Sequence, residues 1–183
     1  MGKINDSKTR KAVLLVLTLS WMGVIFWFSS KSHGESHSMS GKVLMRLLEI
    51  IPIRRVMKGV SVNVLRRRFH MAFRKFAHFT EFSILSALLT TLAHRYFPQY
   101  EKSRRVRVFL RTVLPVSLAL GYAFFDELHQ RGSAGRDSNL LDVLIDFFGI
   151  CFGLLLVKTI TFLHQKRRRK KAQTAEADRA NHD

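Results

Sequence analysis

Four apolar stretches constrain the fold of this chain more than any other feature. They run from residue 12 to 28, 74 to 94, 106 to 125 and 141 to 163. A helix needs about 20 apolar residues to cross the hydrocarbon core of a bilayer, and the first stretch is near the short end of that range. We therefore predict an all-α fold, an integral membrane four-helix bundle that occupies residues 12–163.

Basic residues surround these stretches. The 183 residues carry a formal net charge of +18, which in a soluble protein would suggest nucleic acid as the partner. Most Lys and Arg lie outside the apolar stretches, however, and this favours contact with anionic lipid or an anionic substrate. We expect membrane lipids as partners and no nucleic acid. The single cysteine, Cys151, lies in an apolar stretch and belongs to no disulfide, metal or redox motif.

The two ends of the chain are basic. Residues 1–11 resemble the start of a signal peptide, but Phe28–Lys31 offers no small-x-small cleavage site, so an uncleaved anchor is the favoured interpretation. At the other end, residues 164–183 begin with the basic cluster Lys166–Lys171 and continue as a polar stretch. We expect this tail to be disordered.

A long linker, residues 29–73, separates the first two apolar stretches. Apolar residues recur at roughly helical spacing among basic ones on both sides of Pro52. This pattern predicts short amphipathic helices that lie on the membrane surface in the first extracytoplasmic loop. A plain connecting loop with helical tendency explains the pattern equally well.

The distribution of charge also predicts an orientation. Both termini and the 95–107 turn are basic, whereas the 126–141 turn carries both signs and little net charge. Cytoplasmic loops carry an excess of Lys and Arg, so we expect the termini in the cytoplasm and the 126–141 turn outside. The basic 29–73 linker conflicts with this rule, because the same topology puts it outside. Its arginines would there meet the anionic headgroups of the outer leaflet.

A cluster of polar residues occupies the end of the third stretch and the start of the fourth. Charged groups at the edge of hydrocarbon are costly and usually have a purpose or a partner. In the expected topology the second helix brings further polar residues to the same depth. The candidate site residues are Lys75, His78, Glu81, Asp126, Glu127, His129, Gln130, Arg136, Asp142 and Asp146.

Two features of spacing support a site inside the bundle. Arg74, His78 and Glu81 share one face of the second helix. Asp142 and Asp146 share a face of the fourth helix with two glycines, Gly149 and Gly153, which allow close contact between helices. We therefore expect the two aspartates to point into the bundle rather than toward lipid.

These residues carry a resemblance to the VanZ-like family. The motifs are Lys75-x-x-His78-Phe79, Asp126-Glu127-x-His129-Gln130, Gly135-Arg136 and Asp142-x-x-x-Asp146-x-x-Gly149-x-x-x-Gly153. The resemblance covers most of residues 12–160. It implies a multi-pass protein of the bacterial cytoplasmic membrane, in the envelope of Gram-positive bacteria, linked to resistance against teicoplanin-type glycopeptides.

Three functions fit the cluster. In the first, it binds an anionic lipid or a lipid-linked cell-wall intermediate, with Arg136 gripping phosphate and Arg74 and Lys75 adding charge. In the second, the chain is an enzyme acting on a lipid-linked phosphate or glycosyl substrate. Its acids and bases, or ligands of a hard divalent metal, would be Asp126, Glu127, His129 and Asp142.

In the third, the chain is a structural or partner protein whose cluster only fixes helix packing. Salt bridges at a solvated helix end would then account for the charged residues. No sequential metal motif is present, so we expect no metal and no cofactor.

Overall fold

The structure is a computed structural model in which residues 2–30, 62–97, 103–131 and 140–180 are described. Every element within these ranges is helical, and four helices are long and apolar enough to cross a membrane. The elements are α1 (Gly2–Ser29), α4 (Val62–Tyr96), α5 (Arg104–Val108), the π-helix η1 (Phe109–Val113), α6 (Leu114–Arg131) and α7 (Leu140–Ala180). The predicted all-α, multi-pass membrane fold is confirmed.

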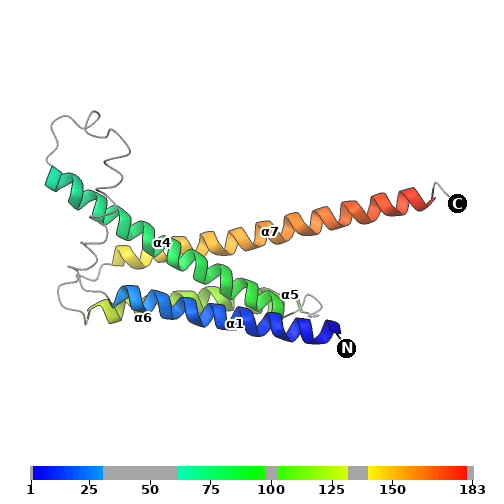
Figure 1. The fold of residues 1–183 in the computed structure, drawn as a ribbon, viewed down its shortest axis with the longest axis horizontal. Coiled ribbons are helices and arrows are strands. Elements are labelled where there is room, and N and C mark those ends of the chain that lie inside the picture. Colours follow the sequence, from blue (N-terminus) through cyan, green and yellow to red (C-terminus); the bar gives the residue numbers. More distant parts are fainter. Residues whose placement is uncertain (1, 31–61, 98–102, 132–139, 181–183) are drawn as a thin grey trace.

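The helices form a bundle in which α4 is central. α4 contacts α1, α6 and α7, and its interface with α7 is the most extensive in the described chain. α4 and α7 run in the same direction, while α1 and α6 run the opposite way, so both termini lie at one end of the bundle (Figure 1). The ends of α1 and α6 and the start of α7 therefore meet at the other end, beside the first half of α4.

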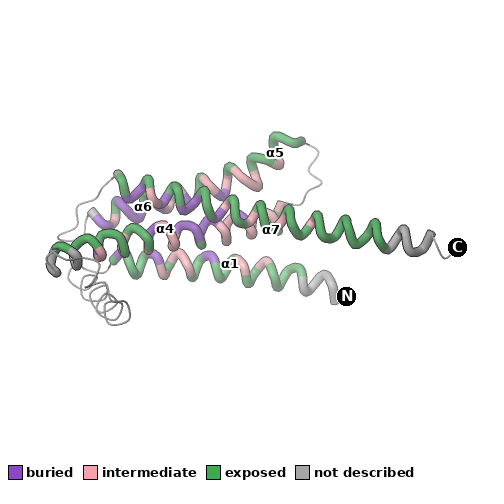
Figure 2. The backbone as a smooth tube through the Cα atoms, turned by 90° about the horizontal axis from the view of Figure 1, so that it is seen from above, coloured by how far each residue is buried: buried purple, intermediate pink, exposed green. Residues whose placement is uncertain are grey.

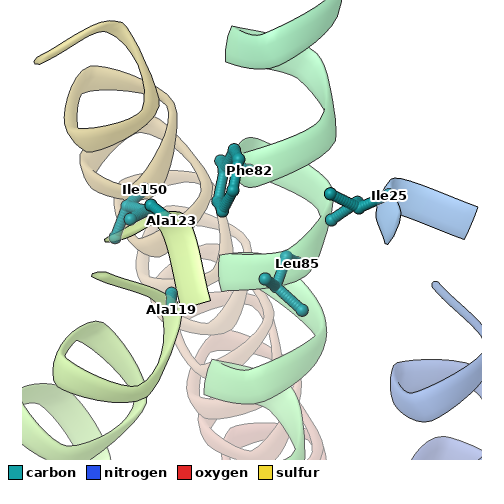
Figure 3. Packing of buried hydrophobic residues seen from close by; sticks show 6 residues of the cluster. All are labelled: Ile25, Phe82, Leu85, Ala119, Ala123 and Ile150. Atoms are coloured by element: carbon teal, nitrogen blue, oxygen red, sulfur yellow. The ribbon is translucent and has the colours of Figure 1, made fainter. Parts of the chain in front are cut away.

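The hydrophobic core is small and lies between these four helices. Its fully buried members come from every span: Ile25, Phe82, Leu85, Ala119, Ala123 and Ile150 (Figure 3). Large apolar side chains such as Trp27, Phe148 and Leu155 are exposed instead. Outward-facing apolar residues suit a bilayer, because lipid tails rather than water cover them.

Two glycines set the distance between α4 and α7. A Cβ added at Gly149 would collide with the backbone carbonyl of Phe79, and one added at Gly153 would collide with that of Ser83. The hydroxyl of Ser86 then donates to the carbonyl of Ile150 across the same interface, at 2.8 Å. The close helix contact predicted for these glycines is therefore present, and α4 is the partner.

Two helices are longer than the sequence suggested. α4 begins at Val62, well before residue 74, and α7 continues to Ala180. The disorder expected for residues 164–183 is thus corrected to a helix as far as Ala180, which extends past the bundle (Figures 1 and 2). Lys, Arg, Gln and Ala are good helix formers, and the chain has no Gly or Pro after Gly153 to end the helix. The predicted amphipathic helices between residues 31 and 61 lie outside the described residues.

Hydrogen bonds from aromatic side chains connect α1 to α6 and α4. Tyr122 donates its hydroxyl to the carbonyl of Met22 at 2.7 Å, and Trp21 donates its indole N–H to the carbonyl of Glu81 at 3.0 Å. Both acceptors are backbone groups inside helices, so the donors add to the helical hydrogen bonds rather than replace them.

Removing the Tyr122 hydroxyl tests this connection. We expect Tyr122→Phe to lower the free energy of unfolding by about 1 kcal/mol, the usual net contribution of one hydrogen bond. Thermal unfolding of the purified protein in detergent measures it. Tyr96→Phe is the control, because Tyr96 is exposed and its ring contact with Lys11 does not need the hydroxyl. Equal stability of the two variants would contradict the prediction.

Candidate functional site

Polar side chains from all four spans converge at the end of the bundle opposite the termini. Several of them are buried although they are charged or strongly polar: His78, Asp126, Glu127, Gln130, Asp142 and Asp146. We call the side chains that form hydrogen bonds or ion pairs here the polar network: Ser29, Arg74, His78, Asp126, Gln130, Asp142 and Asp146. Its members are separated by up to 117 positions in sequence, from Ser29 to Asp146, so only the packing of the helices brings them together.

Arg74 joins three helices. Its Nη2 lies 3.1 Å from Oδ2 of Asp142 on α7 and donates to Oε1 of Gln130 on α6, also at 3.1 Å. The Arg74 side chain is 21% exposed and that of Asp142 is 11% exposed. An ion pair so poorly hydrated needs good geometry and further hydrogen bonds to offset the cost of desolvation. The bond to Gln130 supplies one of these.

Gln130 on α6 forms hydrogen bonds with three other members of the network. Its amide Nε2 donates to Oδ2 of Asp126 at 2.8 Å and to Oγ of Ser29 at 3.1 Å, while its Oε1 accepts from Arg74. Asp126 and Gln130 are four residues apart on one helix, the spacing at which side chains meet. The amide is fully buried and uses both its donor and its acceptor groups. Gln130 therefore connects α1, α4 and α6 at one point.

His78 and Asp146 form a second contact between α4 and α7. His78 Nδ1 lies 3.3 Å from Oδ1 of Asp146, and both side chains are buried. The pair lies one helical turn beyond Arg74 and Asp142 on both helices, because α4 and α7 run parallel. The two glycines that follow Asp146 keep this register tight.

Other candidates from the sequence occupy different places. His129 faces α1: its Nε2 lies 3.1 Å from Oγ of Ser30 and its ring lies 4.6 Å from that of Phe26. Lys75 is exposed, and Glu81 is half-buried on α4, with its charge acting on His78. Glu127 is buried on α6. Arg136 lies outside the described residues.

The network retains capacity for further hydrogen bonds. Oδ1 of Asp126 and Nε of Arg74 are buried and have no hydrogen-bond partner among the described residues. A buried polar atom without a partner costs about 1–3 kcal/mol, so such atoms are informative in a folded chain. No set of three or more His, Cys, Asp or Glu side chains within the described ranges is arranged to hold a metal ion.

Carboxylates outnumber cations in this region. Around the described part of the network, Arg74 and His78 face Asp126, Glu127, Asp142 and Asp146. This balance suits a ligand that donates hydrogen bonds, such as hydroxyl or ammonium groups, or a proton relay. A phosphate group would require additional cations from outside the described residues.

Sequence reasoning missed Ser29 as a member of the network and did not pair Arg74 with Asp142. The i, i+4 spacing of Arg74 and His78 showed that both share a face, but it did not show which helix they meet. Ser29 could have been found from its position, because a polar residue at the end of the first apolar stretch lies at the same end of the bundle as the other polar residues.

Comparison with known proteins identifies a family. The family model described as VanZ/LLP1 matches residues 14–163, which include every member of the network. No curated protein and no solved structure matches the chain.

Proposed function

The chain belongs to the VanZ/LLP1 family, and from that premise we propose that it is a cell-envelope protein whose polar network binds the headgroup of a lipid or a lipid-linked cell-wall intermediate. Binding there would link the protein to the response to teicoplanin-type glycopeptides. The proposed orientation has both termini in the cytoplasm, as their positive charge favours. The network then lies near the outer surface of the membrane.

The observation that carries this proposal is the incomplete pairing of the network. A set of side chains that served only to pack helices would use its buried polar atoms within the protein. Asp126 Oδ1 and Arg74 Nε are buried without a hydrogen-bond partner among the described residues. One accepts and the other donates, so the two atoms support a ligand that carries both kinds of group. Sugars and the amino groups of a cell-wall precursor have this chemistry.

The surplus of carboxylates refines the choice of headgroup. Asp126 and Asp146 would accept hydrogen bonds from hydroxyl or ammonium groups of the ligand. The phosphate of a lipid-linked intermediate would need a separate cation, and Arg136 in the 126–141 turn is the candidate for that role. Arg74 is less suited to phosphate, because Asp142 and Gln130 already engage its Nη2.

A membrane-embedded enzyme is the second candidate, and the contact between His78 and Asp146 favours it. A carboxylate beside Nδ1 orients the imidazole and leaves Nε2 for proton transfer. The substrate would again be a lipid-linked phosphate or glycosyl compound. In this version His78 is the general acid or base, a role that the sequence-based hypothesis gave to Asp126, Glu127, His129 or Asp142.

Antibiotic susceptibility tests both candidates. A strain deleted for this chain is complemented with wild type, Asp126→Asn, His78→Gln or the control Leu128→Ala, and its teicoplanin and vancomycin susceptibilities are measured. We expect Asp126→Asn to leave the strain as susceptible to teicoplanin as the deletion. Leu128 is exposed in the same turn of α6, so its variant should complement fully.

The amount of each variant in the membrane is measured in parallel by immunoblot. Full complementation by Asp126→Asn at equal amounts would contradict the proposal. If Asp126→Asn fails and His78→Gln complements fully, the result supports the binding function. It excludes an enzyme in which His78 transfers protons.

A further inference from the structure

At the end of the bundle that carries the termini, α7 continues past the other helices (Figures 1 and 2). Residues 166–174 are all exposed there, and one face of this part of α7 lines a groove of about 630 Å³. The lining residues are Phe162, Gln165, Lys166, Arg169, Lys170 and Gln173. Successive members of this set that are three or four residues apart are neighbours on one side of a helix. We call this face the α7 groove.

Helix geometry divides the basic cluster of α7 into two halves. Three of its cations line the groove: Lys166, Arg169 and Lys170. The other three are exposed as well but do not line it: Arg167, Arg168 and Lys171. Each residue turns a helix by about 100°, so the second set points away from the groove. In the first set the Cβ atoms are about 5–6 Å apart, which lets the three side chains converge on one anionic group.

The groove begins near the edge of the hydrocarbon layer. α4 and α7 run parallel, and Gly153 of α7 lies against Ser83 of α4. Equal lengths of helix beyond this contact bring Phe162–Lys166 to about the level of Tyr96, the last residue of α4. Lys11 of α1 lies at that level too, because its Nζ is 5.1 Å from the centroid of the Tyr96 ring. Tyr is enriched at membrane–water interfaces, and Lys near a helix end extends to them.

The order of side chains along the groove matches the order of groups in a phospholipid. Phe162 is 64% exposed and lies on the hydrocarbon side, where an acyl chain can cover its ring. Lys166 follows one turn later, and Arg169 and Lys170 follow one turn beyond it, toward the layer of headgroups. An anion that also carries an apolar chain therefore fits the groove better than a soluble anion.

We propose that the α7 groove binds an anionic phospholipid, with an acyl chain against Phe162 and the phosphate among Lys166, Arg169 and Lys170. The guanidinium of Arg169 matches two phosphate oxygens, and each ammonium adds a point charge. The α7 groove and the polar network share no residue and lie at opposite ends of the bundle. The proposal therefore does not depend on the function proposed above.

Native mass spectrometry of the full chain in detergent tests the proposal. The probe is phosphatidylglycerol, and phosphatidylcholine is the zwitterionic comparison. The groove variant combines Lys166→Gln, Arg169→Gln and Lys170→Gln. The control variant removes the same charge from the other side of the helix: Arg167→Gln, Arg168→Gln and Lys171→Gln. We expect the groove variant to bind phosphatidylglycerol about tenfold to a hundredfold more weakly than wild type, since each Lys or Arg near a headgroup adds to the attraction.

The control variant should weaken binding by about threefold or less, because its charges act on the headgroup only through solvent. Equal losses in the two variants would overturn the proposal, since a diffuse basic helix would then explain lipid binding. Unchanged binding in the groove variant would also overturn it. Both variants should have the circular dichroism and thermal unfolding of wild type, because the replaced residues are exposed and Gln is a good helix former.

Phe162→Ala keeps every charge and tests the contact with the acyl chain. It should weaken binding of phosphatidylglycerol about threefold to tenfold through the loss of apolar contact. Unchanged binding in this variant, together with displacement of the lipid by inorganic phosphate at constant ionic strength, would assign a soluble anion to the groove and overturn the proposal. Weaker binding of a short RNA to the groove variant than to the control variant, with no such difference for phosphatidylglycerol, would assign nucleic acid and overturn it as well.

Discussion

Gly153→Ala will destabilise this protein by about 2–3 kcal/mol, the upper range for overpacking a tightly packed contact. In a helix the same substitution ordinarily gains about 1 kcal/mol, since alanine is the better helix former. The sign reverses here because the added methyl group would collide with the backbone carbonyl of Ser83, which has no flexible side chain to move aside. α4 and α7 must separate to accept it.

Thermal unfolding in detergent, monitored by size-exclusion chromatography, measures this effect. Gly121→Ala and Gly23→Ala are matched controls, because an added Cβ meets nothing within 4 Å at either position. They should be neutral or more stable than wild type by up to about 1 kcal/mol. If Gly153→Ala were as stable as Gly121→Ala, the tight packing of α4 on α7 would be wrong.

Separation of α4 and α7 in Gly153→Ala would also affect the polar network. The contacts of Arg74 with Asp142 and of His78 with Asp146 both cross the interface that Gly149 and Gly153 hold together. A separation of the helices would increase the distance between the partners in both contacts. We therefore expect Gly153→Ala to weaken the function of the network as well as the stability of the bundle, although Gly153 lies outside the network.

Arg74→Met will cost about 3 kcal/mol, because it leaves the largely buried carboxylate of Asp142 without its cation. Replacing both partners should cost far less, since a well-packed apolar pair can substitute for a buried ion pair. The double variant Arg74→Met with Asp142→Leu should therefore recover most of the stability that the single variant loses. Thermal unfolding of the four proteins in this cycle gives the coupling energy between the two residues.

The same double variant separates a working site from a packing device. If the network acts on a ligand, the stable double variant will still fail to restore teicoplanin response in the deleted strain. If it restores both stability and response, the charged pair serves only to pack the helices, and the structural interpretation is correct. Additive losses of stability in the double variant would instead show that Arg74 and Asp142 do not interact.

Much of the fold was predictable because hydropathy is a local property. Each apolar stretch predicts a membrane helix independently of the others, and all four spans are present. The boundaries were less accurate. Residues 62–73 and 164–180 are helical although they are polar. These segments are rich in residues with high helix propensity, which extend the helices beyond the apolar stretches.

The candidate site was predictable in membership but not in its connections. Periodicity put Asp142, Asp146 and the two glycines on one face, and the structure has this face against α4. Periodicity put Arg74 on the face of His78 and Glu81, but Lys75, which is exposed, was predicted to belong to the site as well. Periodicity also did not show that His129 contacts Ser30 and Phe26.

The sequence by itself determined the helical membrane fold, the end of the bundle where polar residues gather and the small-residue face of α7. Tertiary structure alone decided which of those polar residues meet. Hydrogen bonds and ion pairs act over about 3 Å, so they depend on the register and distance between helices. Backbone contact at Gly149 and Gly153 sets that distance between α4 and α7, and no single segment of the chain encodes it.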